Sequence, residues 1–255
     1  MDNKILEKCL NQKLNIELFD ELDSTNNYLK KLGSQGEMNT TLVIAESQTG
    51  GRGRMGRSFY SPNGTGIYFS LLLHPEFSAE KSLFLTVMAA VSVAETVMKY
   101  NSNDVKIKWV NDIYIDGKKV CGILTEGSIN AEKKLDYAVV GIGINIMAPE
   151  EGFPEDIKTS ATAIFPGKTQ DNIKEKLVAE IVNKFFDMYN GKDTDYAKRY
   201  KEYSYLTGKE INIISGDSVR PATVLRITDE CHLLVKNENG EIEEISSGDV
   251  SVRVK

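Results

Sequence analysis

The sequence is poor in the residues that bind metals and form disulfides. It contains two histidines and three cysteines in 255 residues, and Cys9, Cys121 and Cys231 are too far apart to form a C-x-x-C motif. Zinc sites and disulfide-stabilised domains usually contain closely spaced sets of such residues. We therefore expect neither, and we interpret the three cysteines as reduced packing residues.

Basic residues are also in deficit. Thirty-one lysines and arginines against 37 aspartates and glutamates give a net charge of -6, whereas dedicated nucleic-acid binders are usually basic. The charged N-terminal segment does not resemble a signal peptide, and no uninterrupted apolar run reaches the length of a membrane span. These absences predict a cytoplasmic protein that binds neither DNA nor membranes.

The remaining composition is that of a globular protein with mixed secondary structure. Helices are predicted at 2–13, 24–33, 79–101, 171–190 and 194–205. Strands are predicted at 16–22, 42–45, 67–74 and 135–146, together with a hairpin at 105–126 that turns at Asp116-Gly117. We therefore expect an α/β (α+β) domain over residues 1–206.

The pattern changes near Gly208. Short alternating strands follow, separated by turn sequences at Asn239-Gly240 and Ser247-Gly248. Such spacing is typical of small all-β barrels. Residues 207–255 are therefore predicted to form a second, smaller domain.

The most unusual stretch is TLVIAESQTGGRGRMGR, residues 41–57, in which a strand opens into a loop with four glycines and three arginines. By letter the loop satisfies G-x-G-x-x-G and nearly satisfies the P-loop pattern. Both patterns require a helix immediately afterwards, but a turn and a strand follow here. The sequence instead predicts a loop between two strands that binds a carboxylate or phosphate. Because its arginines repel one another, we expect an anionic ligand to order it.

Other polar positions allow two interpretations each. Ser24-Thr25-Asn26 can cap a helix or bind a ligand, and Asn111-Asp112 can form a turn or belong to a site. Gly141 and Gly143, two apart in a strand, indicate a bulge or the close approach of a ligand or another backbone. The segment 148–169 is long for a connection, which favours a functional or mobile segment.

Taken together, DSTN, ESQTGGRGRMGR, KWVND, KKVCGIL and GIGIN resemble the biotin protein ligase family over nearly the whole chain. Val110 stands where the family usually has proline. The residues before Ser24 leave no room for the helix-turn-helix domain of many bacterial relatives. The resemblance implies the mixed, mostly antiparallel sheet of class II aminoacyl-tRNA synthetases and biotin ligases, followed by an SH3-like β-barrel.

The resemblance also implies an activity. Biotin would attack the α-phosphate of ATP, with Mg²⁺, to give biotinyl-5'-AMP, and a lysine of a biotin carboxyl carrier protein or domain would then take the biotin. The alternatives are a lipoate or octanoate ligase or transferase of the same fold, and a non-catalytic biotin sensor. A homodimer is left open.

Roles follow for the residues that match the family motifs. Catalysis is expected of Lys119, Arg54 and Asp112. Biotin binding is expected of Ser24, Thr25, Asn26, Gln48, Arg52, Gly53, Arg54, Lys119 and Gly122. ATP or adenylate binding is expected of Arg52, Arg54, Arg57, Lys108, Asn111 and Asn145. Mg²⁺ is expected to arrive with ATP, with no protein ligand assigned, and Phe153 or Phe165 is expected to cover the adenine.

Overall fold

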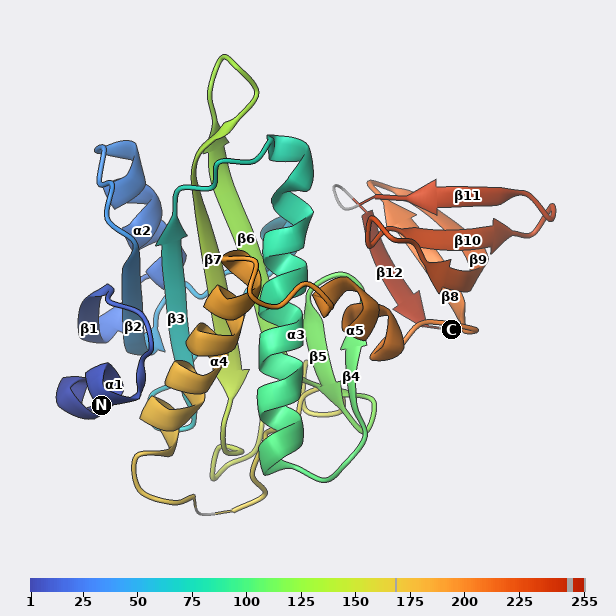
Figure 1. The fold of residues 1–255 in the computed structure, drawn as a ribbon. Coiled ribbons are helices and arrows are strands. Elements are labelled where there is room, and N and C mark those ends of the chain that lie inside the picture. Colours follow the sequence, from blue (N-terminus) through green and yellow to red (C-terminus); the bar gives the residue numbers. More distant parts are fainter. Residues whose placement is uncertain (168, 247–249, 255) are drawn as a thin grey trace.

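Two β-sheets organise the protein (Figure 1). The computed structural model describes residues 1–167, 169–246 and 250–254. The large sheet consists of β1 (Asn15–Leu22), β2 (Thr41–Gln48), β3 (Gly66–Leu73), β4 (Val105–Lys108), β5 (Asp112–Ile115), β6 (Lys118–Ile129) and β7 (Leu135–Asn145). Its order is β1-β2-β3-β7-β6-β5-β4, and only the β1–β2 pair is parallel. The prediction of a mixed, mostly antiparallel sheet is confirmed.

Helices cover both faces of this sheet. They are α1 (Asn3–Cys9), α2 (Thr25–Ser34), α3 (Leu83–Tyr100), α4 (Ile173–Tyr189) and α5 (Tyr196–Glu202), with short 3₁₀ turns η1 (Arg54–Gly56) and η2 (Ala79–Ser82). Figure 1 shows α3 and α4 lying across one face. The helix α2 packs on the other face, where Leu29 joins a small core with Val43, Leu72 and Val139.

The helix α3 is the main core helix, as its broad apolar stripe predicts. Together with η2 it forms a segment, Ala79–Tyr100, that is long and apolar enough to cross a membrane. However, 72% of its apolar window is buried inside the protein, as in the core helix of a soluble protein. Leu42, Ile44 and Phe69 belong to the same large core as α3. Because side chains alternate along a strand, the residues between them face α2.

The structure corrects two predicted boundaries. The first helix ends at Cys9 rather than near residue 13, because Leu10 has an extended backbone and its N–H group caps the helix through the carbonyl of Leu6. The segment 105–126 contains three strands rather than two, because Trp109, Val110 and Asn111 form a corner between β4 and β5 with a cis Trp109–Val110 peptide. The predicted turn at Asp116-Gly117 is confirmed, and both residues have positive φ.

The second sheet is antiparallel and has five strands. They are β8 (Glu210–Ser215), β9 (Ser218–Ile227), β10 (Leu233–Asn237), β11 (Ile242–Ile245) and β12 (Val250–Val254), in the order β11-β10-β9-β8-β12. This arrangement confirms the predicted β unit and is consistent with an SH3-like fold. Gly240, in the predicted turn at Asn239-Gly240, has a left-handed φ of 86°. The turn predicted at Ser247-Gly248 lies outside the described residues.

Candidate active site

The glycine-arginine loop folds as a tight hairpin between β2 and β3. The N–H group of Gly53 donates to the carbonyl of Arg57 at 2.7 Å, and that of Phe59 donates to the carbonyl of Gly51 at 2.9 Å. A Cβ atom at Gly51 would lie 2.4 Å from the carbonyl oxygen of Phe59, so this close approach requires glycine. The loop contains only the 3₁₀ turn η1 and leads into β3 rather than into an α-helix, so, as predicted, it is not a helix-anchored phosphate loop.

Small residues from three strands form the floor of a pocket on the face that carries α2. Gly122 of β6 lies opposite Gly143 of β7, and Gly141 of β7 lies opposite Ser70 of β3. Since side chains alternate between faces, all four positions point the same way. The register of the sheet therefore creates a patch with almost no side chains in the middle of a large sheet.

Two side chains of the protein itself occupy the space above this floor. A Cβ atom at Gly141 would lie 1.9 Å from Oδ1 of Asn26, and one at Gly143 would lie 2.6 Å from the ring of Phe59. The ladder has no irregularity at either glycine, so the bulge interpretation is wrong. The glycines are closely approached, as predicted, but by the side chains of Asn26 and Phe59 rather than by a ligand or another backbone.

A chain of buried hydrogen bonds forms one wall of the pocket. The side-chain oxygen of Gln48 accepts from the backbone N–H of Thr25 at 2.9 Å and from its hydroxyl at 3.2 Å. The hydroxyl oxygen of Ser70 lies 2.7 Å from both Thr25 Oγ1 and Asn26 Oδ1. Ser24 is the N-cap of α2, as predicted, and accepts from the N–H of Asn27 at 3.5 Å.

The amide groups of Asn26 and Gln48 are held in fixed orientations. Asn26 Nδ2 donates to the carbonyl of Leu124 at 3.1 Å and to Glu126 at 3.0 Å. Gln48 Nε2 donates to the hydroxyl of Ser61 at 3.1 Å. The cavity left between these groups, Phe59 and the glycine floor measures about 30 Å³, which is room for one or two waters.

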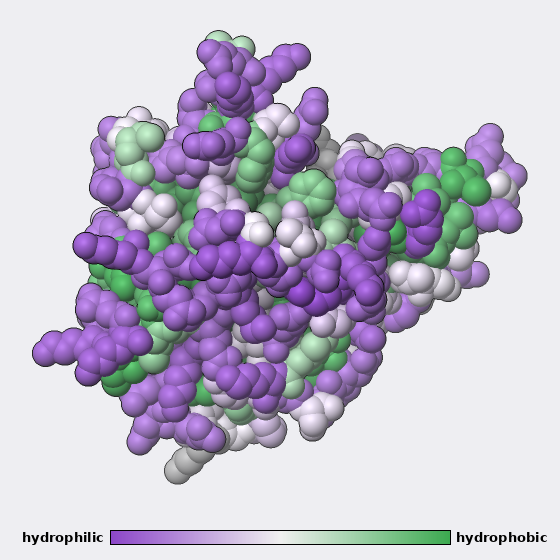
Figure 2. Space-filling model, viewed as in Figure 1, coloured by the Kyte–Doolittle hydropathy of each residue, from purple (hydrophilic) through white to green (hydrophobic). Residues whose placement is uncertain are grey.

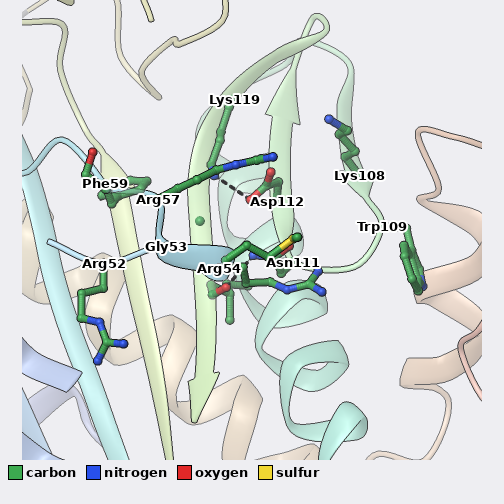
Figure 3. Close-up of a pocket in the computed structure, with 14 residues that line it drawn as sticks. Arg52, Gly53, Arg54, Arg57, Phe59, Lys108, Trp109, Asn111, Asp112 and Lys119 are labelled. Atoms are coloured by element: carbon green, nitrogen blue, oxygen red, sulfur yellow. Dashed lines mark hydrogen bonds and ion pairs between the residues drawn. The ribbon is translucent and has the colours of Figure 1, made fainter. Parts of the chain in front are cut away.

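A larger cleft of about 160 Å³ adjoins this pocket (Figure 3). Its lining includes Lys119, Asp112, Arg54 and Arg57. Lys119 Nζ lies 2.7 Å from the carboxylate of Asp112 and 5.6 Å from the centre of the Phe59 ring. Phe59 lines both cavities, as do Arg52 and Gly122.

The backbone of Lys119 is fixed by the long segment that follows β7. Its N–H group donates to the carbonyl of Ser160 at 2.7 Å, and its carbonyl accepts from the N–H of Thr162 at 2.8 Å. Lys118, its neighbour, is exposed. The segment 148–169 thus adds a short parallel bridge to the sheet at Lys119, which accounts for part of its unusual length.

The three arginines of the loop do not share one direction. All three arginines line the cleft, but Figure 3 shows the side chain of Arg52 pointing away from Lys119. Arg52 NH1 donates to Asn27 Oδ1 at 2.8 Å and lies 3.2 Å from the carboxylate of Glu126. Arg52 therefore contacts α2 and β6 rather than Lys119.

The residues predicted to bind ATP are more dispersed. Lys108 and Asn111 line the cleft, but Lys108 Nζ lies 3.3 Å from the hydroxyl of Tyr114. Asn111 Nδ2 donates to the carbonyl of Ile123 at 2.7 Å. Asn145 ends β7 and donates to the carbonyl of Thr162 at 3.0 Å, and it lines neither cavity. Gly53 and Gly122 line the cleft, and Gly122 also lines the smaller pocket.

The aromatic residues considered for adenine lie elsewhere in this structure. Phe153 and Phe165 line a separate cavity of about 550 Å³, and Phe165 packs against Tyr100 with ring centres 6.2 Å apart. Trp109 borders the cleft, but its indole N–H donates to the carbonyl of Cys231 in the second sheet at 3.0 Å. None of the three rings faces Lys119.

Sequence reasoning missed three residues of this region. Ser70 is a polar residue in the otherwise apolar, fully buried strand β3, a signal that could have found it. Phe59 follows the arginine loop directly, which makes it a natural candidate for a neighbour of the site. Glu126 carries no local signal, because its partners Asn26 and Arg52 are distant in the sequence.

Comparisons with known proteins assign this arrangement to a family. Residues 18–145 match the model of the biotin/lipoate A/B protein ligase family, and residues 206–253 match the model of the biotin protein ligase C-terminal domain. The chain belongs to the biotin/lipoate A/B protein ligase family. The family resemblance noted from the motifs is thereby confirmed.

Individual relatives agree with this assignment. The chain is 31% identical to the bifunctional ligase/repressor BirA of Bacillus spizizenii, over 91% of the chain and 72% of the relative. It is 23% identical to the biotin–[acetyl-CoA-carboxylase] ligase of Mycobacterium tuberculosis, over 92% of the chain and 88% of the relative. It is also similar to a solved structure, the biotin protein ligase from Aquifex aeolicus in complex with biotin and ATP. That match has a TM-score of 0.76 and 30% identity, and covers 94% of this chain and 99% of the other.

Proposed function

We propose that the protein is an ATP-dependent biotin protein ligase. It activates biotin to biotinyl-5'-AMP and then transfers the biotin to a lysine of a biotin carrier domain. The observation that carries the proposal is the ammonium group of Lys119, which lies 2.7 Å from Asp112 in an arginine-lined cleft beside a small polar pocket. The names of the related ligases and the solved complex with biotin and ATP support it.

The first step joins two anions. A carboxylate oxygen of biotin attacks the α-phosphorus of ATP, and the bond to the β-phosphate breaks to release pyrophosphate. Repulsion between carboxylate and polyphosphate opposes this approach. The ammonium group of Lys119 and the guanidinium groups of Arg54 and Arg57 offset that repulsion, and they stabilise the charge that develops on the α-phosphate oxygens.

The second step transfers the acyl group. The amine of the carrier lysine attacks the acyl carbon of biotinyl-5'-AMP, the C–O bond to AMP breaks, and the amine loses a proton. Asp112 is the carboxylate nearest Lys119, and we assign it the task of orienting the incoming amine. The loop that carries Arg54 and Arg57 keeps water away from the mixed anhydride in the interval between the two steps.

The ring system of biotin is assigned to the pocket of Ser24, Thr25, Asn26 and Gln48. A cavity of about 30 Å³ is too small for it, so binding requires the ring of Phe59 to leave the glycine floor. That movement opens the pocket toward the cleft, because the ring of Phe59 lines both cavities together with Arg52 and Gly122. It also brings the carboxylate end of the ligand toward Lys119.

ATP is assigned to the arginine side of the cleft. Lys108 and Asn111 border this side, whereas Asn145 would contact the nucleotide only together with the segment 148–169 to which it is bonded. Among the described residues, no group of three His, Cys, Asp or Glu side chains could hold a metal ion. We therefore assign Mg²⁺ to the phosphates of ATP rather than to a protein cage.

The test is ATP–pyrophosphate exchange with biotin, lipoate and octanoate in turn. Exchange that depends on biotin, followed by biotin transfer to a carrier domain detected by mass spectrometry, is the expected result. Exchange supported by lipoate or octanoate but not by biotin would assign the protein to the other branch of its family.

Four further assignments belong to the same proposal. The partner is a biotin carboxyl carrier protein or domain, the location is the cytoplasm, and the catalytic and β domains meet at residues 206 and 207. The acidic net charge argues against operator binding, and a gel shift at low salt with operator-like DNA tests this point. Sedimentation with and without biotin and ATP tests for a homodimer.

A further inference from the structure

Glu126 links three parts of the candidate site through one carboxylate. It lies on β6, and its side chain is 18% exposed. It accepts from Lys30 Nζ at 2.7 Å and from Asn26 Nδ2 at 3.0 Å, both on α2, and it lies 3.2 Å from NH1 of Arg52 on the loop. No other carboxylate among the described ion pairs contacts the loop through Arg52.

The surroundings of Glu126 keep it charged. Burial disfavours the carboxylate, but hydrogen bonds from Lys30 and Asn26 and the charges of Lys30 and Arg52 outweigh that effect and hold its pKa below the ordinary value. Two cations therefore share one anion in a half-buried position. Removing that anion would leave Lys30 and Arg52 facing each other without compensation.

Arg52 is held from two sides at the base of the hairpin. Besides Glu126, it donates to Asn27 Oδ1 at 2.8 Å, so its guanidinium is fixed on α2. Its backbone pairs with Ser58 across the hairpin, and Gly53 pairs with Arg57 one step further. Fixing Arg52 consequently fixes the frame that carries Arg54 and Arg57 over the cleft.

We propose that Glu126 is a positioning residue that docks the glycine-arginine loop onto α2 through Arg52 and so keeps the loop closed over the acyl-adenylate. The docking itself depends only on the described contacts, whereas its purpose rests on the proposed function. The docking also reduces the charge repulsion among the three arginines of the loop when no substrate is bound. The carboxylate of Glu126 neutralises Arg52. The carboxylate of the substrate would bind beside Lys119 and would not have to displace Glu126.

The test variant is Glu126→Gln. The amide has nearly the same shape and removes the charge. Its single oxygen can accept from Lys30 or from Asn26 but not from both, because these two donate to different carboxylate oxygens of Glu126. The control is Lys30→Met, which removes the other cation from the same carboxylate without touching the loop. Arg52→Met removes the same Arg52–Glu126 ion pair from the loop side. Because Arg52 is 40% exposed, its replacement should not prevent folding.

The first measurement needs no substrate. Trypsin cleaves after arginines in mobile segments, so the rate of cleavage after Arg54 and Arg57, followed by mass spectrometry, reports opening of the loop. We expect about a fivefold faster cleavage in Glu126→Gln and Arg52→Met, the size expected for losing one partly exposed ion pair. The double variant Glu126→Gln/Arg52→Met should be cleaved no faster than either single variant. Lys30→Met should be cleaved at the rate of the unaltered protein.

The second measurement is the rate at which biotinyl-5'-AMP formed in the protein is lost to solution without a carrier. It should also rise about fivefold in Glu126→Gln, since the same opening limits both processes. Cleavage at the unaltered rate in Glu126→Gln and Arg52→Met, or equal acceleration in Lys30→Met, would overturn the docking proposal. Failure of the unaltered protein to form any adenylate would instead refute the proposed function, while the trypsin result would still decide the docking.

Discussion

Lys119 differs from the adjacent Lys118 in what surrounds its ammonium group. Lys118 is exposed at the start of β6, whereas Lys119 lies beside Asp112, above Phe59, and its backbone is bonded to the segment 148–169. Both lysines follow the same turn, so the letters KK do not distinguish them. The difference arises because successive side chains of a strand point to opposite faces.

Replacing Lys119 by alanine should preserve ligand binding and remove most of the chemistry. Loss of one group that stabilises transition-state charge typically costs about 10²- to 10³-fold in rate. We expect calorimetry with biotin to give a measurable affinity for Lys119→Ala, and pyrophosphate exchange to fall by that factor. Lys118→Ala is the matched control and should retain full exchange. Normal turnover in Lys119→Ala would exclude Lys119 from the mechanism.

Gly141 has no room for a side chain. A methyl group there would lie 1.9 Å from Asn26 Oδ1, and overpacking of a buried position typically costs about 1–3 kcal/mol. We therefore expect Gly141→Ala to lower the free energy of unfolding by that amount in urea titrations and to weaken ligand binding. Gly167→Ala is the control, since a Cβ atom there meets nothing within 4 Å. Equal stability of the two variants would show that Asn26 can move aside at little cost.

At the scale of elements, the corner between β4 and β5 joins the candidate site to the second sheet. The indole N–H of Trp109 donates to the carbonyl of Cys231, and the hydroxyl of Tyr200 donates to the carbonyl of Val110 at 2.9 Å. The same corner leads directly to Asp112. Figure 2 shows a largely hydrophilic outer surface on the face it displays, whereas these contacts lie in the buried core that both sheets share.

Trp109→Phe tests this connection because it keeps an aromatic ring and removes the N–H group. The carbonyl of Cys231 would then be buried without its donor, which typically costs about 1–3 kcal/mol. We expect the free energy of unfolding to fall by that amount in urea titrations, with a lower rate of biotin transfer because the corner positions Asp112. Tyr60→Phe, at an exposed aromatic residue, should leave both quantities unchanged. An unaltered unfolding curve for Trp109→Phe would contradict the connection.

Most elements could be predicted from the sequence because hydrophobic periodicity and turn residues are local signals. The corner at Trp109–Asn111 could be predicted only in part: Asn111-Asp112 indicates a possible turn, but the apolar Trp109 and Val110 before it extend the strand pattern. The motifs single out Lys119, Asp112 and Gln48, and each of them lines one of the two cavities of the candidate site. The contacts of Glu126 could not be predicted, because they join strands and helices from distant parts of the chain. For Phe59 the one local signal is its position directly after the loop.

At the scale of the whole molecule, Glu46 connects β2 to the start of α4 and to the N-terminus. Its carboxylate accepts from Lys174 near the start of α4 and from the amino group of Met1. Burial disfavours its charge, but the hydrogen bond and charge of Lys174, followed by those of the amino group, hold its pKa below the ordinary value. This contact joins segments 128 positions apart.

The lowered pKa of Glu46 predicts an acid-dependent stability. A carboxyl group whose pKa is lower in the folded than in the unfolded state stabilises the fold above the unfolded value, and this contribution disappears as the pH falls through the folded value. We expect Glu46→Gln to lower the free energy of unfolding by about 1.5–3 kcal/mol at pH 7. The difference from the unaltered protein should shrink in urea titrations at about pH 3. A difference that stays constant with pH would mean that Lys174 contributes through packing alone.

The buried chain from Gln48 to Asn26 has a consequence for ligand choice that follows from counting hydrogens. The nitrogens of Gln48 and Asn26 donate elsewhere, so the oxygens of both amides face this chain, where they can only accept. Thr25 and Ser70 supply one hydroxyl hydrogen each for the three contacts along the chain, so one acceptor position is always vacant. A ligand that brings an N–H group can fill it, and the ureido ring of biotin carries two. The ring of lipoate and the chain of octanoate carry no N–H group. The vacant acceptor position therefore favours biotin, which can donate a hydrogen bond to it, over lipoate and octanoate, which cannot.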